Sequence, residues 1–298
     1  MDLIRLAESV YQLQGGTNVG LIVDGSRALA VDAGLDRDAG RRVVRAAEEL
    51  GIRITAVAIT HAHADHFGGA AEIKRRTGAM VYAPAFEAAI VENPELEAYY
   101  LFSGAQPPAE LRHKFILAPS CPVDGRIEPG PQILAGFAIE AIPMPGHAQN
   151  QMMIAHNDVC FAGDAFFQPA VLEKYGIPFY VDITRAQESL ERLAALNGCF
   201  TWFVPGHGSA ITDITSVAEL NLQRIQAIRE HVRAALREPI AAEGVLATVT
   251  ETMGISISTL AVYYLTFTTI HACLSALQAA GEVTVEVRDN RALWHLIR

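Results

Sequence analysis

The sequence predicts an α+β protein in which a large N-terminal domain is followed by a small C-terminal domain. Short apolar runs typical of strands alternate with helical patterns over the first 85 residues, and strands resume at about 132–142, 151–156 and 158–162. Pro239 stops a long helical pattern and marks a boundary near residue 238. The length of 298 residues fits one large domain plus a small one.

Hydrophobic periodicity and turn residues predict the elements of the N-terminal part. The apolar run at 54–60 lacks polar alternation, as expected for a strand that is covered on both faces. Gly51 is expected to close an amphipathic helix. Residues 86–119 hold helical pieces broken by Pro and Gly, which predicts an inserted helical flap. The strands are expected at 10–14, 18–23, 28–32 and 54–60, and the helices at 36–50 and 69–77.

The C-terminal sixty residues have the order of a winged helix, which is three helices followed by a β-hairpin. We therefore expect two domains, a larger one over 1–237 and a winged-helix-like one over 238–298. Capping-box patterns are expected to begin two helices before this boundary. These patterns are Thr184 with Gln187 and Ser216 with Glu219, and the C-terminal elements are expected at 240–253, 256–264, 267–280, 283–287 and 292–297.

Composition narrows the class of protein. The formal net charge of −10 argues against a nucleic-acid partner, because phosphate binding relies on Lys and Arg. The four cysteines are far apart and no Cys-X-X-Cys occurs, which fits free thiols in a reducing cytoplasm. The N-terminus lacks the pattern of a signal peptide. Residues 252–281 carry no charge but are rich in Ser and Thr, so no membrane span is expected.

The stretch THAHADHFGG, residues 60–69, concentrates potential metal ligands directly after an apolar strand. His61 and His63 are spaced so that a loop can close both imidazoles on one cation. Asp65 and His66 can turn towards a second cation. Imidazole together with carboxylate suits zinc, with manganese or iron as alternatives.

Three further polar residues follow apolar strands elsewhere in the chain. His147 and His207 each stand in a Pro-Gly-His sequence, and Asp164 follows the strand-like run VCFAG. A Pro-Gly turn at the end of a strand presents the next side chain at the edge of the sheet, where functional loops gather. We therefore expect these residues to join the cluster at 61–66.

Taken together, HxHxDH at 61–66, PGH at 145–147, GD at 163–164 and PGHG at 205–208 resemble the metallo-β-lactamase superfamily of metallohydrolases. The resemblance covers residues 1–237. It implies a four-layer αβ/βα sandwich, in which two mixed sheets lie face to face with helices outside and a metal site lies at one edge. The order of the C-terminal elements resembles the winged-helix appendage of some members, among them endoribonucleases.

The resemblance also implies a ligand for each position of a dinuclear site. Asp164 would bridge the two metals, and this set resembles that of glyoxalase II and RNase Z. True β-lactamases of the best-known subclass carry Cys at the position of Asp164, and flavodiiron oxygen reductases carry Glu at that of His63. The first metal would be bound by His61, His63 and His147, and the second by Asp65, His66 and His207.

The chemistry follows from such a ligand set. A carboxylate that holds two divalent cations roughly 3.5–4 Å apart lets a water between them lose a proton near pH 7. The hydroxide would attack a carbonyl carbon or a phosphorus, and Asp65 is also expected to orient this water. Because ligand histidines must be neutral, activity is expected to fall on acidification.

The substrate is less well specified. Aromatic residues near the ligands, Phe166, Tyr175 and Tyr180 among them, predict a wall for an apolar substrate portion. The main hypothesis is a dinuclear hydrolase of a small ester, thioester or lactone. The alternatives are a phosphodiesterase or endoribonuclease, and a mononuclear iron enzyme like the persulfide dioxygenases. Other aromatic candidates for this wall are Phe167, Phe179, Tyr99, Tyr100 and Phe102.

The predicted third C-terminal helix argues against nucleic-acid binding by the appendage. A winged helix that grips nucleic acid would place Lys and Arg on this helix, but residues 267–280 contain none. We therefore expect the appendage to pack against the catalytic domain or a second subunit. The expected partner is a small-molecule substrate, and a homodimer would form through the C-terminal domain or the flap.

Overall fold

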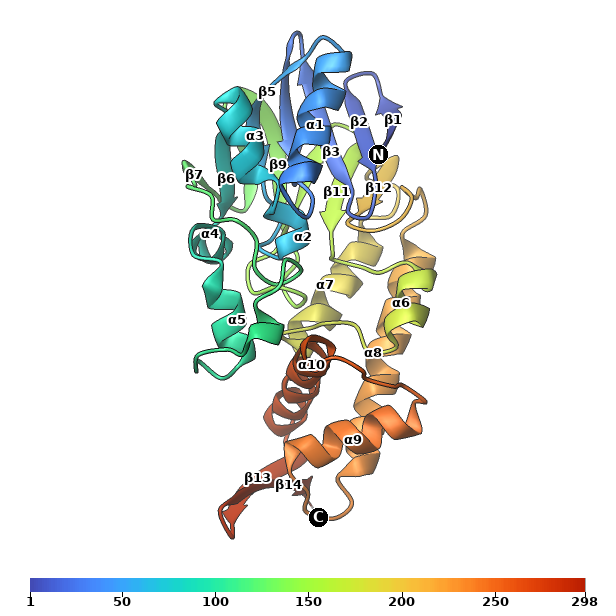
Figure 1. The fold of residues 1–298 in the computed structure, drawn as a ribbon. Coiled ribbons are helices and arrows are strands. Elements are labelled where there is room, and N and C mark those ends of the chain that lie inside the picture. The colour runs from blue at the N-terminus through green and yellow to red at the C-terminus, as the bar shows by residue number, and fades with distance from the viewer. Residues whose placement is uncertain (298) are drawn as a thin grey trace.

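The computed structural model describes residues 1–297 and contains two sheets that pack face to face, with helices outside (Figure 1). The first sheet has seven strands in the order β1 to β7; neighbours from β1 to β4 are antiparallel, and those from β4 to β7 are parallel. Its strands are β1 Asp2–Ala7, β2 Val10–Gln14, β3 Val19–Asp24, β4 Arg27–Val31, β5 Arg53–Ala58, β6 Met80–Pro84 and β7 Gly125–Ile127.

The second sheet has five strands in the order β12-β11-β10-β9-β8. Only the β11–β12 pair in this order is parallel. The strands are β8 Gly130–Leu134, β9 Phe137–Pro143, β10 Met152–His156, β11 Val159–Gly163 and β12 Trp202–Pro205.

Strand β11 shows why its sequence lacks polar residues. Val159 and Phe161 face the apolar core between the two sheets, whereas Cys160 and Ala162 face the core under the helices. Successive side chains point to opposite faces of a strand, and here both faces are covered. Gly20 on β3 makes room for this packing, because a Cβ there would lie 2.3 Å from the Phe161 ring.

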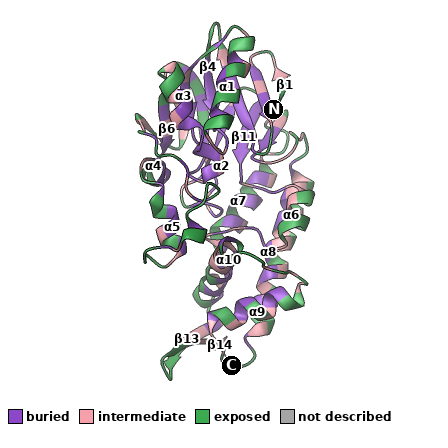
Figure 2. Ribbon diagram, viewed as in Figure 1, coloured by how far each residue is buried: buried purple, intermediate pink, exposed green. Residues whose placement is uncertain are grey.

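Helices cover the outer face of each sheet, which completes the predicted four-layer sandwich. Helices α1 (Arg37–Glu49) and α3 (Ala70–Thr77) pack on the first sheet, and α7 (Ile183–Ala195) and α8 (Thr215–Ala235) pack on the second. The inner strands of both sheets are buried, whereas β1 at the edge of the first sheet is mostly exposed (Figure 2). The remaining helices before the C-terminal segment are α2 Ala64–Phe67, α4 Ala85–Glu92, α5 Glu95–Leu101, the 3₁₀ turn Ala109–Leu111 and α6 Pro169–Tyr175.

The structure corrects several local predictions. Neither predicted capping box forms: the N-cap of α7 is Asp182, whose side chain accepts from the Arg185 amide, and α8 begins at Thr215 without a side-chain cap. The strand predicted at 132–142 is a hairpin of β8 and β9, because the chain turns at Ala135–Gly136, where both φ angles are positive. The sequence patterns do not predict β1, β6, β7, α2 or α6.

The C-terminal segment contains α9 (Ala242–Thr252), α10 (Leu260–Ala279) and the hairpin of β13 (Val283–Arg288) and β14 (Arg291–Leu296). The prediction of two helices over 256–280 is wrong, since α10 is continuous. The Thr259 side chain caps it by accepting from the Val262 amide. A winged-helix-like domain at 238–298 stays a prediction.

Helix α10 lies against the flap and against α7 and α8 (Figure 1). Ala261 shares a small apolar cluster with Leu101, Leu111 and Ile116 from the flap segment, so the expected packing of the appendage on the N-terminal part is confirmed. Within residues 1–297, α10 is also the helix that is long and apolar enough to cross a membrane by length and composition; 44% of its most apolar window is buried inside the protein. Buried core helices meet the same criterion.

Candidate metal centre

All seven predicted ligands lie at one edge of the sandwich, in the segments that directly follow strands. The loop after β5 carries His61 and His63 and then folds into the short helix α2 with Asp65 and His66. The loops after β9, β11 and β12 carry the other three predicted ligands, which are His147, Asp164 and His207.

Glycines allow these loops to approach one another. A Cβ at Gly68 would lie 1.9 Å from the Leu35 carbonyl oxygen, and one at Gly206 would lie 2.0 Å from Asp164 Oδ1. Gly146 has a φ of 133°, and a Cβ there would lie 2.4 Å from the Ala186 Cα. The Gly residues of the FGG and PGH motifs are therefore required by close backbone packing.

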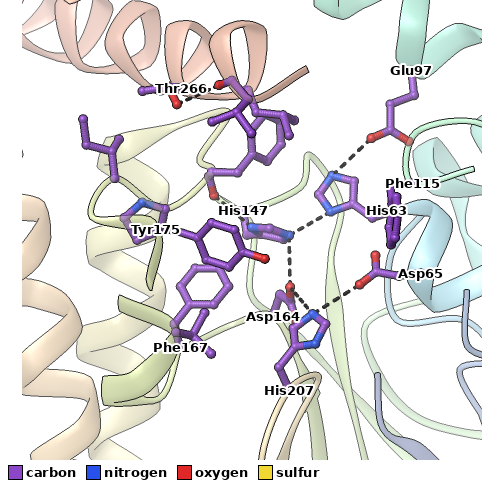
Figure 3. Close-up of a pocket in the computed structure, with 16 residues that line it drawn as sticks. His63, Asp65, Glu97, Phe115, His147, Asp164, Phe167, Tyr175, His207 and Thr266 are labelled. Carbon is purple, nitrogen blue, oxygen red and sulfur yellow. Dashed lines mark hydrogen bonds and ion pairs between the residues drawn. The ribbon is translucent and has the colours of Figure 1, made fainter. Parts of the chain in front are cut away.

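The ligand atoms fall into overlapping groups in which all atoms lie within 4.8 Å of one another. His147 Nε2 is 2.8 Å from His63 Nδ1, and His207 Nε2 is 3.2 Å from Asp65 Oδ2. Figure 3 shows His63, Asp65, His147, Asp164 and His207 converging on one pocket. The groups are His61, His63 and His147; His61, His66 and Asp164; and Asp65, His66 and His207.

Three atoms of this cluster show that it fits a cation. His61 Nε2, His66 Nε2 and Asp164 Oδ1 are fully buried and have no hydrogen-bond partner within the described part of the chain. Buried polar atoms are almost always partnered, so atoms left free at a point of convergence need another ligand. Imidazole nitrogens and carboxylate oxygens are the ligands of zinc, iron and manganese in proteins.

The second ring nitrogen of four histidines is held by the protein, and these partners were missed by the sequence analysis. Such contacts fix the ring so that the other nitrogen points at the metal. The contacts are His61 Nδ1 with Thr60 Oγ1 at 3.1 Å, His66 Nδ1 with Asp32 Oδ2 at 2.8 Å, His147 Nδ1 with the Phe179 carbonyl at 2.9 Å, and His207 Nδ1 with the Gly16 carbonyl at 2.6 Å.

Two buried glutamates of the flap also reach the site. Glu87 accepts hydrogen bonds from the amides of Ala62 and Asn150, each at 2.8 Å, and so joins two of the ligand-bearing loops. Glu97 Oε1 lies 4.0 Å from His63 Nε2 and lines the pocket. No sequence pattern marked either residue, since each shares its helix with a second Glu, Glu92 in α4 and Glu95 in α5, and no motif distinguishes the two.

The charges in the cluster are unevenly distributed. Burial opposes the charged form of His66, but Asp164, Asp65 and Asp32 outweigh it and raise its pKa to about 10. Asp164 and Asp65 raise the pKa of His207 to about 12 in the same way. Burial, reinforced by His147, lowers the pKa of His63 to about 3. Asp65 and Asp164 therefore favour the protonated form of His66 and His207, whereas burial favours the neutral form of His63.

A pocket of about 230 Å³ opens onto the cluster. Tyr175 lines it as predicted, and so do Phe167 and Phe179. Phe166 and Tyr180 are only 1% and 3% exposed and belong to the core under the helices rather than to the pocket wall. The structure also places Tyr99, Tyr100 and Phe102 outside this wall; the flap contributes Phe115 and Glu97 instead.

The sandwich and its edge site are those of a known family. The family model described as the metallo-beta-lactamase superfamily matches residues 13–207, so the chain belongs to that superfamily, as its motifs predict. A metallo-beta-lactamase family protein from Thermus thermophilus has the same fold, with a TM-score of 0.75 and 21% identity over 98% of this chain and 100% of that chain. The shared fold thus extends into the C-terminal helices.

Curated relatives within the family carry hydrolase names. An atrochrysone carboxyl ACP thioesterase from Aspergillus fumigatus is 26% identical over 76% of this chain and 61% of its own length. A hydroxyacylglutathione hydrolase from Dechloromonas aromatica is 30% identical over 60% of this chain and 53% of its own. The chain spans 53% to 62% of the length of the first five curated relatives that it matches.

Proposed function

We propose that this protein binds two divalent cations, zinc in the first instance, and hydrolyses an ester, thioester, lactone or related acyl compound. The observation that carries the proposal is the position of Asp164 between two groups of histidines. Its Oδ2 lies 3.6 Å from Nε2 of both His147 and His207, and its Oδ1 lies 3.4 Å from His66 Nε2. One carboxylate thus faces both candidate metal positions.

The residues have distinct roles in this proposal. Two bound cations would supply a nucleophilic hydroxide at neutral pH and polarise the acyl carbonyl. Asp65 is fixed by the Thr17 hydroxyl, which donates to its Oδ2 at 3.1 Å, and is proposed to orient the attacking water. The first metal would be held by His61, His63 and His147, the second by Asp65, His66 and His207, and both by Asp164.

The pocket supports an acyl substrate better than a phosphodiester. None of the 16 lining residues is Lys or Arg, and burial raises the pKa of Glu97, so apart from the candidate metals no cationic side chain would receive a phosphate. A phosphate group binds where cationic side chains or free amides receive it. The wall is instead mainly aromatic and aliphatic, which suits an acyl group. Relatives named a thioesterase and a hydroxyacylglutathione hydrolase also support an acyl substrate.

The test is elemental analysis of the purified protein together with turnover of acyl thioesters, esters, lactones, bis-p-nitrophenyl phosphate and single-stranded RNA. We expect about two metal equivalents per chain and metal-dependent hydrolysis of acyl compounds only. Asp164→Ala should lose at least one equivalent and most turnover, whereas Asp158→Ala, in the exposed β10–β11 turn, should lose neither.

Three results would contradict the proposal in different ways. Unchanged metal content in Asp164→Ala would refute the shared carboxylate. Cleavage of RNA or of the phosphodiester alone would establish the phosphodiesterase alternative. A single bound iron with oxygen uptake and no hydrolysis would establish the dioxygenase alternative.

A further inference from the structure

The pocket is closed at one end by a helix that lies outside the residues matched by the family model. Val262, Leu265 and Thr266 of α10 line it, and Figure 3 shows Thr266 at one end while Asp164 and His207 lie at the other. The space between the candidate metals and α10 is therefore a chamber with a reactive end and an apolar end.

The apolar end has no charged group on its helix. The sequence of α10, LAVYYLTFTTIHACLSALQA, contains no Asp, Glu, Lys or Arg, and the Thr266 hydroxyl is used within the helix, where it donates to the Val262 carbonyl at 2.8 Å. The side walls between the two ends come from Phe115, Val171, Phe167, Ile177, Pro178 and Phe179. Apart from the candidate metal ligands, the polar side-chain groups of the lining are Glu97 and the hydroxyls of Tyr175 and Thr266, so a charged substrate tail would find few partners there.

Several of the lining side chains are left open to solvent. Phe115 is 63% exposed, Tyr175 is 52% exposed and Val262 is 40% exposed, although all three are large and apolar. Apolar side chains gathered around a concave site mark it as one that receives an apolar group.

From these observations we infer that the substrate carries an apolar acyl group that ends against α10, so that Leu265 limits its length. Because α10 bounds the chamber at the end away from the candidate metals, the chamber admits an acyl group of limited length. This inference rests on the proposed acyl hydrolase function, and it makes the C-terminal segment a specificity-determining part of the site.

A series of straight-chain acyl thioesters from two to sixteen carbons tests it with the metal-loaded protein. We expect kcat/KM to rise by up to about fourfold per methylene and then to reach a maximum within this series. Leu265→Trp should move the maximum to a shorter chain, and Leu265→Ala should move it to a longer one. Leu260, 37% exposed on the same helix and outside the lining, provides matched controls as Leu260→Trp and Leu260→Ala.

Binding of straight-chain methyl ketones, measured by calorimetry, separates this inference from the proposed function. Ketone affinity should show the same length limit and the same shifts in the Leu265 variants, even if no thioester is cleaved; that result would remove the hydrolase proposal and keep the chamber. Hydrolysis with a flat chain-length profile, or with equal shifts in Leu260 and Leu265 variants, would overturn the chamber. Thermal unfolding shows whether each variant is folded. If Leu265→Trp does not fold, the shift of the maximum in Leu265→Ala decides whether Leu265 limits the length of the acyl group.

Discussion

The hydroxyl of Thr269, on α10, donates a hydrogen bond of 2.9 Å to the carbonyl of Pro178, a residue 91 positions earlier in the chain. The same oxygen accepts from the Tyr180 amide at 2.9 Å. Between these two residues, the Phe179 carbonyl faces His147 Nδ1 at 2.9 Å. A buried side chain of the C-terminal segment thus holds the loop that orients a candidate metal ligand.

Replacing Thr269 with Val keeps the shape and removes both hydrogen bonds. We expect a loss of about 1–3 kcal/mol in the free energy of unfolding, because a buried carbonyl and a buried amide are left without a partner. Metal affinity should also fall, since the Phe179 carbonyl is less well fixed against His147. Urea unfolding and competition with a chelator measure the two effects.

Thr268→Val is the matched control for this change. The Thr268 hydroxyl donates only to the Tyr264 carbonyl one turn earlier in α10. This variant should keep the metal affinity of the wild type. Equal metal affinity in Thr269→Val and Thr268→Val would show that α10 does not position His147.

Glu87 joins the loop of Ala62 to the loop of Asn150, and these loops carry the three histidines proposed for the first metal. In Glu87→Gln, one carboxylate oxygen becomes an NH₂ group that faces a backbone N–H. We expect about 1–3 kcal/mol less stability and a selective loss of one metal equivalent. Elemental analysis checks the second effect. Glu95→Gln, at an exposed site, should change neither.

Asp32 supports the second group of candidate ligands, which is Asp65, His66 and His207. It accepts from the Thr60 amide at 2.8 Å, and its Oδ2 faces His66 Nδ1 at 2.8 Å. Its φ of 64° is left-handed, a conformation that Asn tolerates, so Asp32→Asn should keep the backbone. We expect the affinity for one metal to fall about 10- to 100-fold, as for other carboxylates that orient ligand histidines. A chelator titration in which the variant matches the wild type would contradict this.

The sequence predicted the candidate metal ligands from their positions after apolar strands, with a turn glycine beside His147, Asp164 and His207, and from the motifs of the superfamily that the chain resembles. His61, His147, Asp164 and His207 all follow apolar runs, and the ends of neighbouring strands meet at one edge of the sandwich. The supporting residues carry no such mark. Asp32 meets a histidine 34 positions away, and the partners of Thr269 lie 89 and 91 positions away, so only the tertiary fold brings them together.

The C-terminal segment shows a different limit of sequence patterns. Residues 256–280 have no charged face, so periodicity could not place a helix boundary there, and two helices were expected where α10 is one. The absence of a charged face fits the several neighbours of α10, which packs against the flap and against α7 and α8 and also lines the pocket. Phe166 and Tyr180 were assigned to the substrate wall by sequence proximity alone, and their side chains turn into the core.

Glu72 provides a pH-dependent contribution to stability away from the metal centre. This buried carboxylate accepts from Arg75 at 2.8 Å and from Arg76 at 2.6 Å, and these contacts lower its pKa from 4.5 to about 2. Because the folded-state pKa is lowered, the stabilisation is complete above pH 4.5 and is lost as the pH falls towards 2. Glu72→Gln should be less stable than the wild type at pH 7, by on the order of 1 kcal/mol.

The measurement is urea unfolding of both proteins from pH 7 to pH 3, with the difference between them followed at each pH. We expect that difference to shrink steadily below pH 4.5. Glu49→Gln is the matched control, because Glu49 pairs with the single exposed Arg45 at 2.9 Å and should contribute little at any pH. A Glu72→Gln difference that stays constant down to pH 3 would mean that it arises from packing, not from the charge of the carboxylate.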